Sequence, residues 1–273
     1  MPDIASKVNV LRLEETAPFH QLPKGEKHME TSNKRYREKL VQQIKDAGEE
    51  LIKRSDTLVH PDLELITDFD ITLSFSQDCF PEITDEREAL YLRTIKRYNK
   101  QEQPLFSELA AYMVVALEEN QEQDFLGSIY TELGLNSKEH EQIFTPYHVC
   151  ELMAEITMED IVEKVKKDGY ITLNDPCCGA GATLIAGIHA ARKRLEKANL
   201  NYQNHILVAA QDIDMVVALM CYIQLSLLGV AAYIKVGNSL TEPMTENDSL
   251  DNYWFTMMYF SDIWSMRRLL RSL

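Results

Sequence analysis

The stretch NDPCCGAGATL, residues 174–184, decides the fold class of this chain. It follows the short apolar run 170–173 and opens the helical pattern 184–188. A strand, a tight loop with two glycines and a helix form the arrangement with which α/β sheets present their backbone to a nucleotide-like ligand. Gly179 and Gly181 permit positive φ angles and let such a ligand approach the main chain closely. The stretch therefore predicts an α/β sheet with a ligand-binding loop at a strand end.

The residues around the two glycines exclude two common loop types. Their spacing is not the GxGxxG of dinucleotide enzymes, and the lysine of the phosphate-binding P-loop is absent. Asp175 and Pro176 instead precede the loop, and the pattern resembles the S-adenosylmethionine (SAM) loop of N6-adenine DNA methyltransferases, usually DPxCGxGxx. The resemblance implies that SAM is the cofactor and that Asp175 accepts a hydrogen bond from its methionine amino group. Pro176, Gly179 and Gly181 are then cofactor-binding residues, while Ala182 stands where the family commonly has a further glycine.

A second pair of segments stands upstream of this loop. DFLGSIY at residues 124–130 and QIFTP at residues 142–146 are similar to the LGxxY…GQFFTP pattern of the modification subunits of type I restriction systems. By that resemblance, Phe144, Thr145 and Pro146 pack over the methionine end of SAM. A plain helix start, with Thr145 as N-cap and Pro146 in the first position, is the alternative. The two interpretations are compatible, because a helix start also offers free amides to a carboxylate.

An acidic residue follows the second predicted strand, residues 206–210. A carboxylate at this place can hold both ribose hydroxyls, as in nucleotide-binding sheets generally. The segment QDID resembles the GQE or GQD of the same family, which implies Asp212 as the ribose ligand and Ile213 beside the adenine ring. Asp214 is predicted to be a helix N-cap.

Asn238 follows the third predicted strand, residues 231–236, in the segment GNSL. The family commonly has GD(T/S)L here, and its acid or amide contacts the adenine amino group of SAM. The side-chain carbonyl of Asn238 is an acceptor suited to that contact. A turn residue without a ligand role is the alternative interpretation.

The catalytic tetrapeptide of the family is missing after the third predicted strand. Methylation of adenine N6 requires the base to leave the duplex, and the family binds its amine with (D/N/S)PP(Y/F/W). This chain instead reads NYWFTMMYFSDIW at residues 252–264. Ser261, Asp262 and Trp264 supply an acceptor and an aromatic ring. Because the prolines are absent, the preferred interpretation of these residues is core packing or a partner contact. The catalytic residues are therefore unknown from sequence, and no metal site is predicted.

The net charge of −15 bears on how such a protein meets DNA. Affinity for DNA comes largely from neutralised phosphates, so a protein that binds DNA alone usually carries a basic face. The basic clusters within residues 34–39, 93–100 and 267–271 are interpreted as solvated helix faces. We therefore expect DNA to be bound through a partner specificity or catalytic subunit, and both a homo- and a hetero-oligomer stay open.

The composition is that of an ordinary globular protein. Hydrophobic residues make up 45% and charged residues 26% of the chain. No apolar run reaches the length of a membrane span, and the N-terminus has no signal-peptide pattern. The five cysteines have neither zinc-finger nor CxxC spacing, so reduced thiols in the cytoplasm are expected.

Three regions are expected along the chain. Residues 1–30 are interpreted as a flexible lead-in, residues 31–140 as a mainly helical N-terminal region and residues 141–273 as the SAM-binding α/β domain. The α/β domain is expected to contain a partial Rossmann-like methyltransferase sheet of parallel strands. Helices are predicted from Tyr36 to 52, at 104–119 and 122–134, from Pro146, from the glycine loop to 198 and at 214–228; strands are predicted at 68–75, 170–174, 206–210 and 231–236.

Two function classes and one structural alternative follow. The first is a SAM-dependent adenine-N6 DNA methyltransferase, or a methyltransferase subunit of a restriction-modification-type system that needs a partner for DNA recognition. The second is a catalytically inactive SAM-binding regulatory or interaction protein derived from that family. The third is a scaffold that binds no SAM. The ordered motifs favour the first, and the missing tetrapeptide favours the second.

Overall fold

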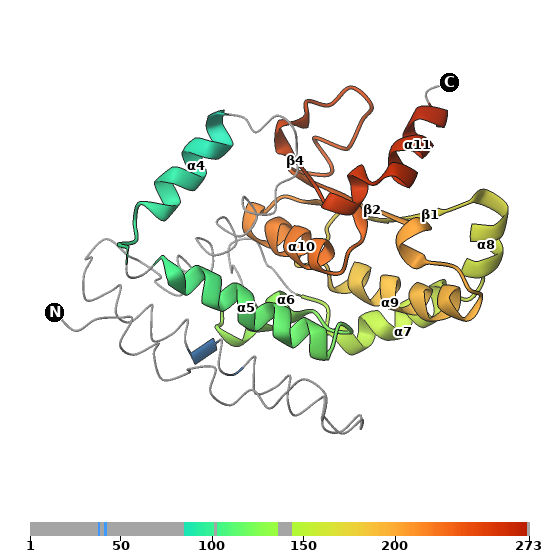
Figure 1. Cartoon of the computed structure of the whole chain (residues 1–273), viewed down its shortest axis with the longest axis horizontal. Helices are drawn as coiled ribbons and strands as arrows, with labels where there is room; N and C mark the ends of the chain where they lie inside the picture. The colour runs from blue at the N-terminus through green and yellow to red at the C-terminus, as the bar shows by residue number, and fades with distance from the viewer. Residues whose placement is uncertain (1–37, 39–40, 43–84, 101–102, 136–143, 272–273) are drawn as a thin grey trace.

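The computed structural model describes residues 38, 41–42, 85–100, 103–135 and 144–271, and Figure 1 draws the remaining residues as a grey trace. The predicted lead-in and the strand predicted at 68–75 lie outside the described residues. Nearly all of the helix predicted from Tyr36 lies outside them as well.

Within the described residues, one sheet of four strands in the order β1-β2-β3-β4 forms the centre of the fold. Its strands are β1 (Ile171–Asp175), β2 (Ile206–Asp212), β3 (Ala231–Val236) and β4 (Tyr253–Phe255). The first three strands are parallel, as predicted, with Asp175 level with Ala210. β4, which was not predicted, runs antiparallel to β3, with Tyr233 opposite Phe255. The reason is the connection: no α-helix follows β3, and without a crossover the chain returns in the opposite direction.

Two helices connect the parallel strands and cover one face of the sheet (Figure 1). They are α9 (Ala182–Lys197), which starts in the glycine loop, and α10 (Met215–Leu227). Because both crossovers proceed in the same direction along the sheet and are right-handed, both helices come to the same side. Nearly every side chain of α10 is buried, which agrees with its apolar sequence.

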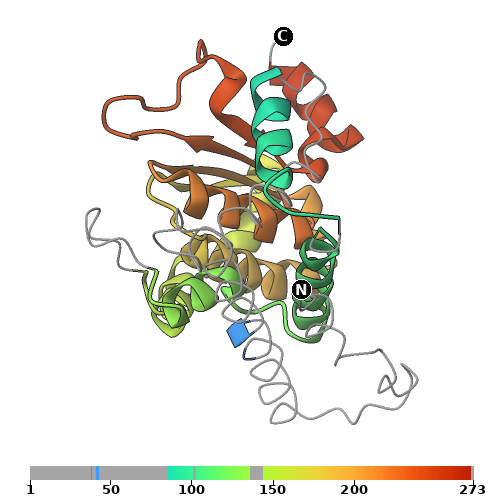
Figure 2. The ribbon, with the colours of Figure 1, turned by 90° about the vertical axis from the view of Figure 1, so that its left-hand side faces the viewer.

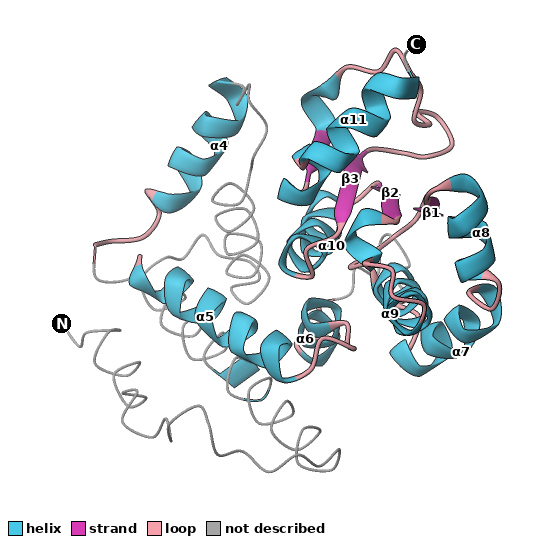
Figure 3. Ribbon diagram, turned by 45° about the vertical axis from the view of Figure 1, so that its right-hand side comes forward, coloured by secondary structure: helices cyan, strands magenta, loops and turns pink. Residues whose placement is uncertain are grey.

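The helices that precede the sheet are α4 (Asp85–Ile95), α5 (Pro104–Glu119), α6 (Phe125–Glu132), α7 (Tyr147–Thr157) and α8 (Ile161–Asp168). α5 and α6 match predicted helices, whereas α4 and α8 were not predicted. Figure 3 shows α7 and α9 side by side. Their contact consists of small residues, which let the two helix backbones approach closely: Cys150, Ala154, Ala182, Ala186 and Ala190.

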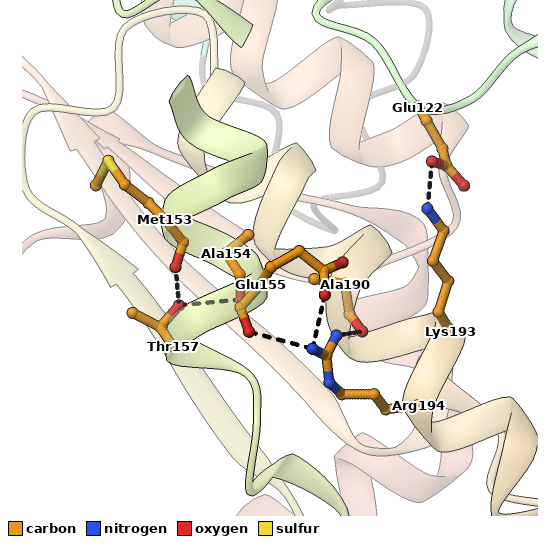
Figure 4. Close-up of polar contacts among 8 residues, drawn as sticks. All are labelled: Glu122, Met153, Ala154, Glu155, Thr157, Ala190, Lys193 and Arg194. Carbon is orange, nitrogen blue, oxygen red and sulfur yellow. Dashed lines mark hydrogen bonds and ion pairs between the residues drawn. The ribbon is translucent and has the colours of Figure 1, made fainter. Parts of the chain in front are cut away.

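Two basic residues of α9 form hydrogen bonds and ion pairs with elements that precede the sheet (Figure 4). Arg194 donates to the Glu155 carboxylate at 2.7 Å and to the main-chain carbonyl of the same residue at 3.1 Å. Lys193 pairs with Glu122, in the link between α5 and α6, at 2.6 Å. The Lys193 and Glu122 side chains are 52% and 40% exposed, so this ion pair marks where α9 meets the preceding elements and contributes little to stability.

The C-terminal elements pack on the other face of the sheet (Figure 2). They are the short 3-10 helix η4 (Met257–Phe260) and α11 (Asp262–Arg271), both of which follow the edge strand β4; α11 was not predicted. Tyr233, Phe255 and Tyr259 form an aromatic cluster on this face, with ring centroids 4.9 to 6.5 Å apart. Residues 253–256 and Trp264 are buried, which agrees with core packing of these residues, whereas Met257 is 72% exposed.

Two arginines of α11 contradict the interpretation of residues 267–271 as a solvated basic face. Arg267 donates to the main-chain carbonyls of Gly169 and Asn204, and its guanidinium lies over the Trp264 ring. Arg268 donates to the carbonyl of Tyr259 at 2.6 Å. Both arginines are half-buried and are bonded within the molecule, because main-chain carbonyls and aromatic faces attract guanidinium groups.

No helix in the described part of the chain combines the length and the apolar character that crossing a membrane requires.

Candidate functional site

The glycine loop between β1 and α9 has two positions that a side chain would disturb. Gly179 and Gly181 have φ angles of 52° and 98°, in the region that favours glycine. A Cβ atom at Gly179 would lie 3.2 Å from the Phe144 ring, and one at Gly181 would lie 2.9 Å from the Cys221 sulfur. The positive φ angles agree with the predicted turn at both glycines, and the close approach of a ligand to their main chain stays a prediction.

Asp175 ties the two ends of this loop together. Its Oδ1 accepts from the Cys177 amide at 3.1 Å, and its Oδ2 accepts from the Thr183 hydroxyl at 2.5 Å. The carboxylate at the end of β1 thus fixes the loop and the first turn of α9 relative to the strand. Its side chain also lines the cavity described below.

Asp212, at the end of β2, contacts the same loop from the neighbouring strand. Its Oδ2 accepts from the Gly179 amide at 2.8 Å, and its Oδ1 accepts from the Asp214 amide at 3.0 Å. Burial raises the pKa of this carboxyl group, while the two amide hydrogen bonds lower it. Asp214 accepts from the Val216 amide at 2.8 Å and is the N-cap of α10, as predicted.

A cavity opens between the glycine loop, the start of α6 and the segment before α7. Five of the predicted residues line it: Phe144, Thr145, Asp175, Gly179 and Asp212. The other predicted residues do not line it: Pro146, Pro176, Gly181, Ile213 and Asn238. Segments more than 60 residues apart in the chain thus meet in one pocket at the carboxyl ends of β1 and β2, where parallel sheets bind their ligands.

The charges around this cavity all have one sign. Asp124, Asp175 and Asp212 line it, and its described lining contains no lysine or arginine. Such a pocket favours a ligand with positive charge and hydroxyl donors, and it disfavours the phosphates of a nucleotide.

The FTP segment leads directly into α7. Phe144 is half-buried, with its ring 5.8 Å from that of Tyr130. Pro146, rather than Thr145, is the N-cap of α7, and no side chain bonds to the helix start. The alternative in which Thr145 caps the helix is therefore wrong. The hydroxyl of Thr145 stays at the exposed wall of the cavity.

Ile213 and Asn238 lie outside the cavity lining. The Ile213 side chain is 60% exposed and directly follows Asp212 in the chain. The Asn238 Oδ1 accepts from the amides of Leu240 and Thr241 at 2.9 and 3.3 Å. This bonding is that of a turn residue, and the contact of Asn238 with an adenine ring stays a prediction.

Among the residues missed from sequence, three have carboxylate, hydroxyl or amide side chains at or behind the cavity. Asp124 and Thr183 line it, and Gln224 is bonded to its wall from α10. The signal for Asp124 was its N-cap position before LGSIY, since its side chain accepts from the Gly127 amide at 3.0 Å. The signal for Gln224 was an amide in an apolar helix, because a buried amide needs hydrogen-bond partners.

The family model for N-6 DNA methylases matches residues 121–272, more than half of the chain. The chain belongs to the N-6 DNA methylase family. The match begins just before α6 and runs through α11, so it includes every element around the cavity and the C-terminal layer. No curated protein matches this chain.

Membership agrees with the resemblance read from the glycine loop and with the mixed α/β fold. The substrate class of this family is adenine in DNA.

Proposed function

We propose that this chain binds SAM and acts as an adenine-N6 DNA methyltransferase, or as the methyltransferase subunit of a restriction-modification-type system. The observation that carries the proposal is the 2.8 Å hydrogen bond from the Gly179 amide to Asp212. It joins the glycine loop to the acid after β2 in one cavity, as a cofactor that spans both would require.

The described residues fit SAM better than a phosphate-bearing nucleotide. SAM has a ribose diol, an ammonium group and a sulfonium, and the cavity offers carboxylates without a basic residue. Asp212 keeps acceptor capacity for ribose hydroxyls, and Asp175 is set to accept from the methionine ammonium group. Bound SAM supplies a methyl group on a positively charged sulfur, while the chain positions it and excludes water with Phe144.

We further propose that a partner subunit supplies much of the DNA contact. The net charge of −15 opposes binding to phosphates. Arg267 and Arg268 are engaged inside the fold. Four described basic residues of the predicted clusters are exposed, all on α4 or just after it: Arg93, Lys96, Arg97 and Lys100. A cytoplasmic location is part of the proposal, supported by four free cysteines among the described residues.

One observation favours the second candidate, a SAM-binding protein without catalysis. The segment after β3, where the family places its catalytic tetrapeptide, is occupied by the buried Trp254 and Trp264. Trp264 packs beside Tyr170, ahead of β1, whereas the cavity lies at the other end of that strand.

Calorimetric titration of the wild-type chain with SAM tests the cofactor. Asp212→Asn removes the charge that accepts from the Gly179 amide, and we expect affinity to fall about tenfold or more, as for a lost charged hydrogen bond. Asp160→Asn is the matched control, because this acid forms an exposed pair with Lys164 on α8. Wild-type protein that binds no SAM contradicts the proposal.

Transfer of tritium from labelled SAM to adenine-containing DNA then separates the two candidates. It is measured for the chain alone and with the products of neighbouring genes. Incorporation of tritium into DNA in any combination supports the enzyme. SAM binding with no incorporation in any combination supports the non-catalytic protein.

A further inference from the structure

Gln224 is a buried amide in the middle of an otherwise apolar helix. It lies on α10 with 1% of its surface exposed, among side chains such as Tyr222 and Leu225 that are fully buried. Burying an amide without partners costs free energy, so its position calls for hydrogen bonds that repay the burial.

All four hydrogen-bonding positions of the Gln224 side chain are used. Its Oε1 accepts from the amides of Phe125 and Leu126 at 2.8 and 3.1 Å. Its Nε2 donates to Asp124 Oδ1 at 2.9 Å and to the Ala180 carbonyl at 2.8 Å. These partners lie at the start of α6, 100 residues away in the chain at Asp124, and in the glycine loop, 44 residues away at Ala180. One side chain thus connects three elements.

Asp124 is held from a second direction as well. Its Oδ1 also accepts from the Gly127 amide at 3.0 Å. A Cβ atom at Gly127 would lie 2.1 Å from Asp124 Oδ2, so the glycine is what leaves room for the carboxylate against the helix. Burial raises the pKa of Asp124, and the hydrogen bonds from Gln224 and Gly127 oppose that rise. The pKa of Asp124 is raised overall, and the two donors that meet its Oδ1, the Gln224 Nε2 and the Gly127 amide, are the contacts that stabilise its charge.

We infer that Gln224 is a positioning residue of the cofactor pocket. It fixes the Asp124 carboxylate and the Ala180 carbonyl relative to each other, and thereby holds a negative charge at the wall for the cationic part of the ligand. The inference rests on the proposed function. It adds Asp124 to the residues that recognise the positively charged ligand, and it makes α10 the element that aligns both walls.

Gln224→Glu is the sharpest test, because it changes one atom of the side chain and keeps its size. The acceptor for Phe125 and Leu126 is retained. The donor is replaced by an oxygen that faces Asp124 Oδ1 and the Ala180 carbonyl, and both contacts become repulsive. We expect the dissociation constant of SAM, measured by calorimetry, to rise at least tenfold.

Gln203→Glu is the matched control. Gln203 donates to the Gly229 carbonyl at 3.1 Å, in the turn that precedes β3 and away from the cavity. The same atom change there also places an oxygen against a carbonyl, so the variant loses stability. Its SAM affinity, measured well below its unfolding temperature, is expected to equal that of the wild type. The comparison separates positioning from a general loss of stability.

A second readout needs no ligand. Cys178, two residues before Ala180, is buried in the glycine loop. In Gln224→Glu the released loop is expected to expose its thiol, so peptide mapping after iodoacetamide treatment shows faster alkylation of Cys178 than in wild type or Gln203→Glu.

The outcomes are distinct. If wild-type and Gln224→Glu protein bind SAM with equal affinity, this inference is overturned and the proposed function stands. Wild-type protein that binds no SAM overturns both. Equal affinity losses in Gln224→Glu and Gln203→Glu, with unchanged Cys178 alkylation, assign Gln224 a purely structural role and overturn the inference as well.

Discussion

Gly181 shows how a single residue connects the glycine loop to the helix behind it. Its φ angle of 98° is unfavourable for any residue with a side chain. A Cβ atom there would also lie 2.9 Å from the sulfur of Cys221, which is fully buried on α10. Both backbone strain and steric conflict therefore oppose substitution at this position.

We expect Gly181→Ala to lower the free energy of unfolding by about 2–4 kcal/mol, from the sum of backbone strain and overpacking. Adding Cys221→Ala in the same chain is expected to restore part of that loss, because it relieves the conflict and leaves the strain. Urea denaturation of both variants measures the effect.

Gly187→Ala is the control for this prediction. Gly187 lies inside α9, and a Cβ there would make ordinary contact with Leu173 at 3.5 Å. Alanine in a helix is favoured over glycine, so this variant should be neutral or more stable. A loss in Gly187→Ala equal to that in Gly181→Ala would refute the argument.

At the scale of elements, the return from β3 to β4 depends on a buried ion pair. Lys235 on β3 is 6% exposed, and its Nζ lies 2.5 Å from Asp248 Oδ2. The same carboxylate accepts from Thr245 and from Tyr253, the first residue of β4. The hydrogen bond from Lys235 is the largest cause that holds the pKa of Asp248 far below its ordinary value, and the hydrogen bonds from Thr245 and Tyr253 lower it further.

We expect Asp248→Asn to be less stable than wild type at pH 7, because it leaves the buried Lys235 charge without its partner. Since the folded-state pKa is lowered, the stabilisation is fully present above the unfolded-state pKa of about 3.9 and is lost as pH falls through the folded-state value. Urea denaturation between pH 7 and 3 should show the difference between the two proteins shrinking in acid.

The control is Asp160→Asn, since exposed pairs such as that with Lys164 contribute little to stability. A difference between wild type and Asp248→Asn that grows on acidification contradicts the assignment.

Helices and strands with a strong local pattern were predictable from sequence. The apolar runs of β2 and β3 and the capping acid Asp214 agree with the structure within a few residues. Two short elements were missed, α8 with 8 residues and β4 with 3 residues. Their lengths are too small for a hydrophobic period to repeat along the sequence. The direction of β4 depends on the absence of a crossover helix, which no local pattern of its own residues reveals.

At the scale of the whole molecule, the C-terminal segment closes the sheet face that α9 and α10 leave open (Figure 2). Trp264 is 2% exposed, donates its Nε1 hydrogen to the Gln203 carbonyl at 2.9 Å and packs edge-on against Tyr170. All these contacts lie at the amino ends of β1 and β2, opposite the cavity.

We expect Trp264→Ala to lower the free energy of unfolding by about 3–5 kcal/mol, as for a large aromatic residue removed from a core. SAM affinity at a temperature where the variant is folded should stay within twofold of wild type, because the cavity is built at the other strand ends. Thermal unfolding and calorimetric titration measure the two quantities.

Trp264→Phe keeps an aromatic ring and loses the hydrogen bond to Gln203, so a smaller loss of stability is expected. A large drop in SAM affinity for either variant would contradict the separation of the two ends of the sheet.

The sequence by itself determined the glycine loop, the acid after the second strand and the helices that connect the strands. These features depend on residues close together in the chain, where φ preference, capping and periodicity act. Only the tertiary structure decided that Gln224 joins Asp124 to Ala180, that Lys235 pairs with Asp248 and that β4 runs antiparallel. The pairing of buried polar groups depends on which segments the packed core brings within hydrogen-bond distance, and the local sequence does not encode that meeting.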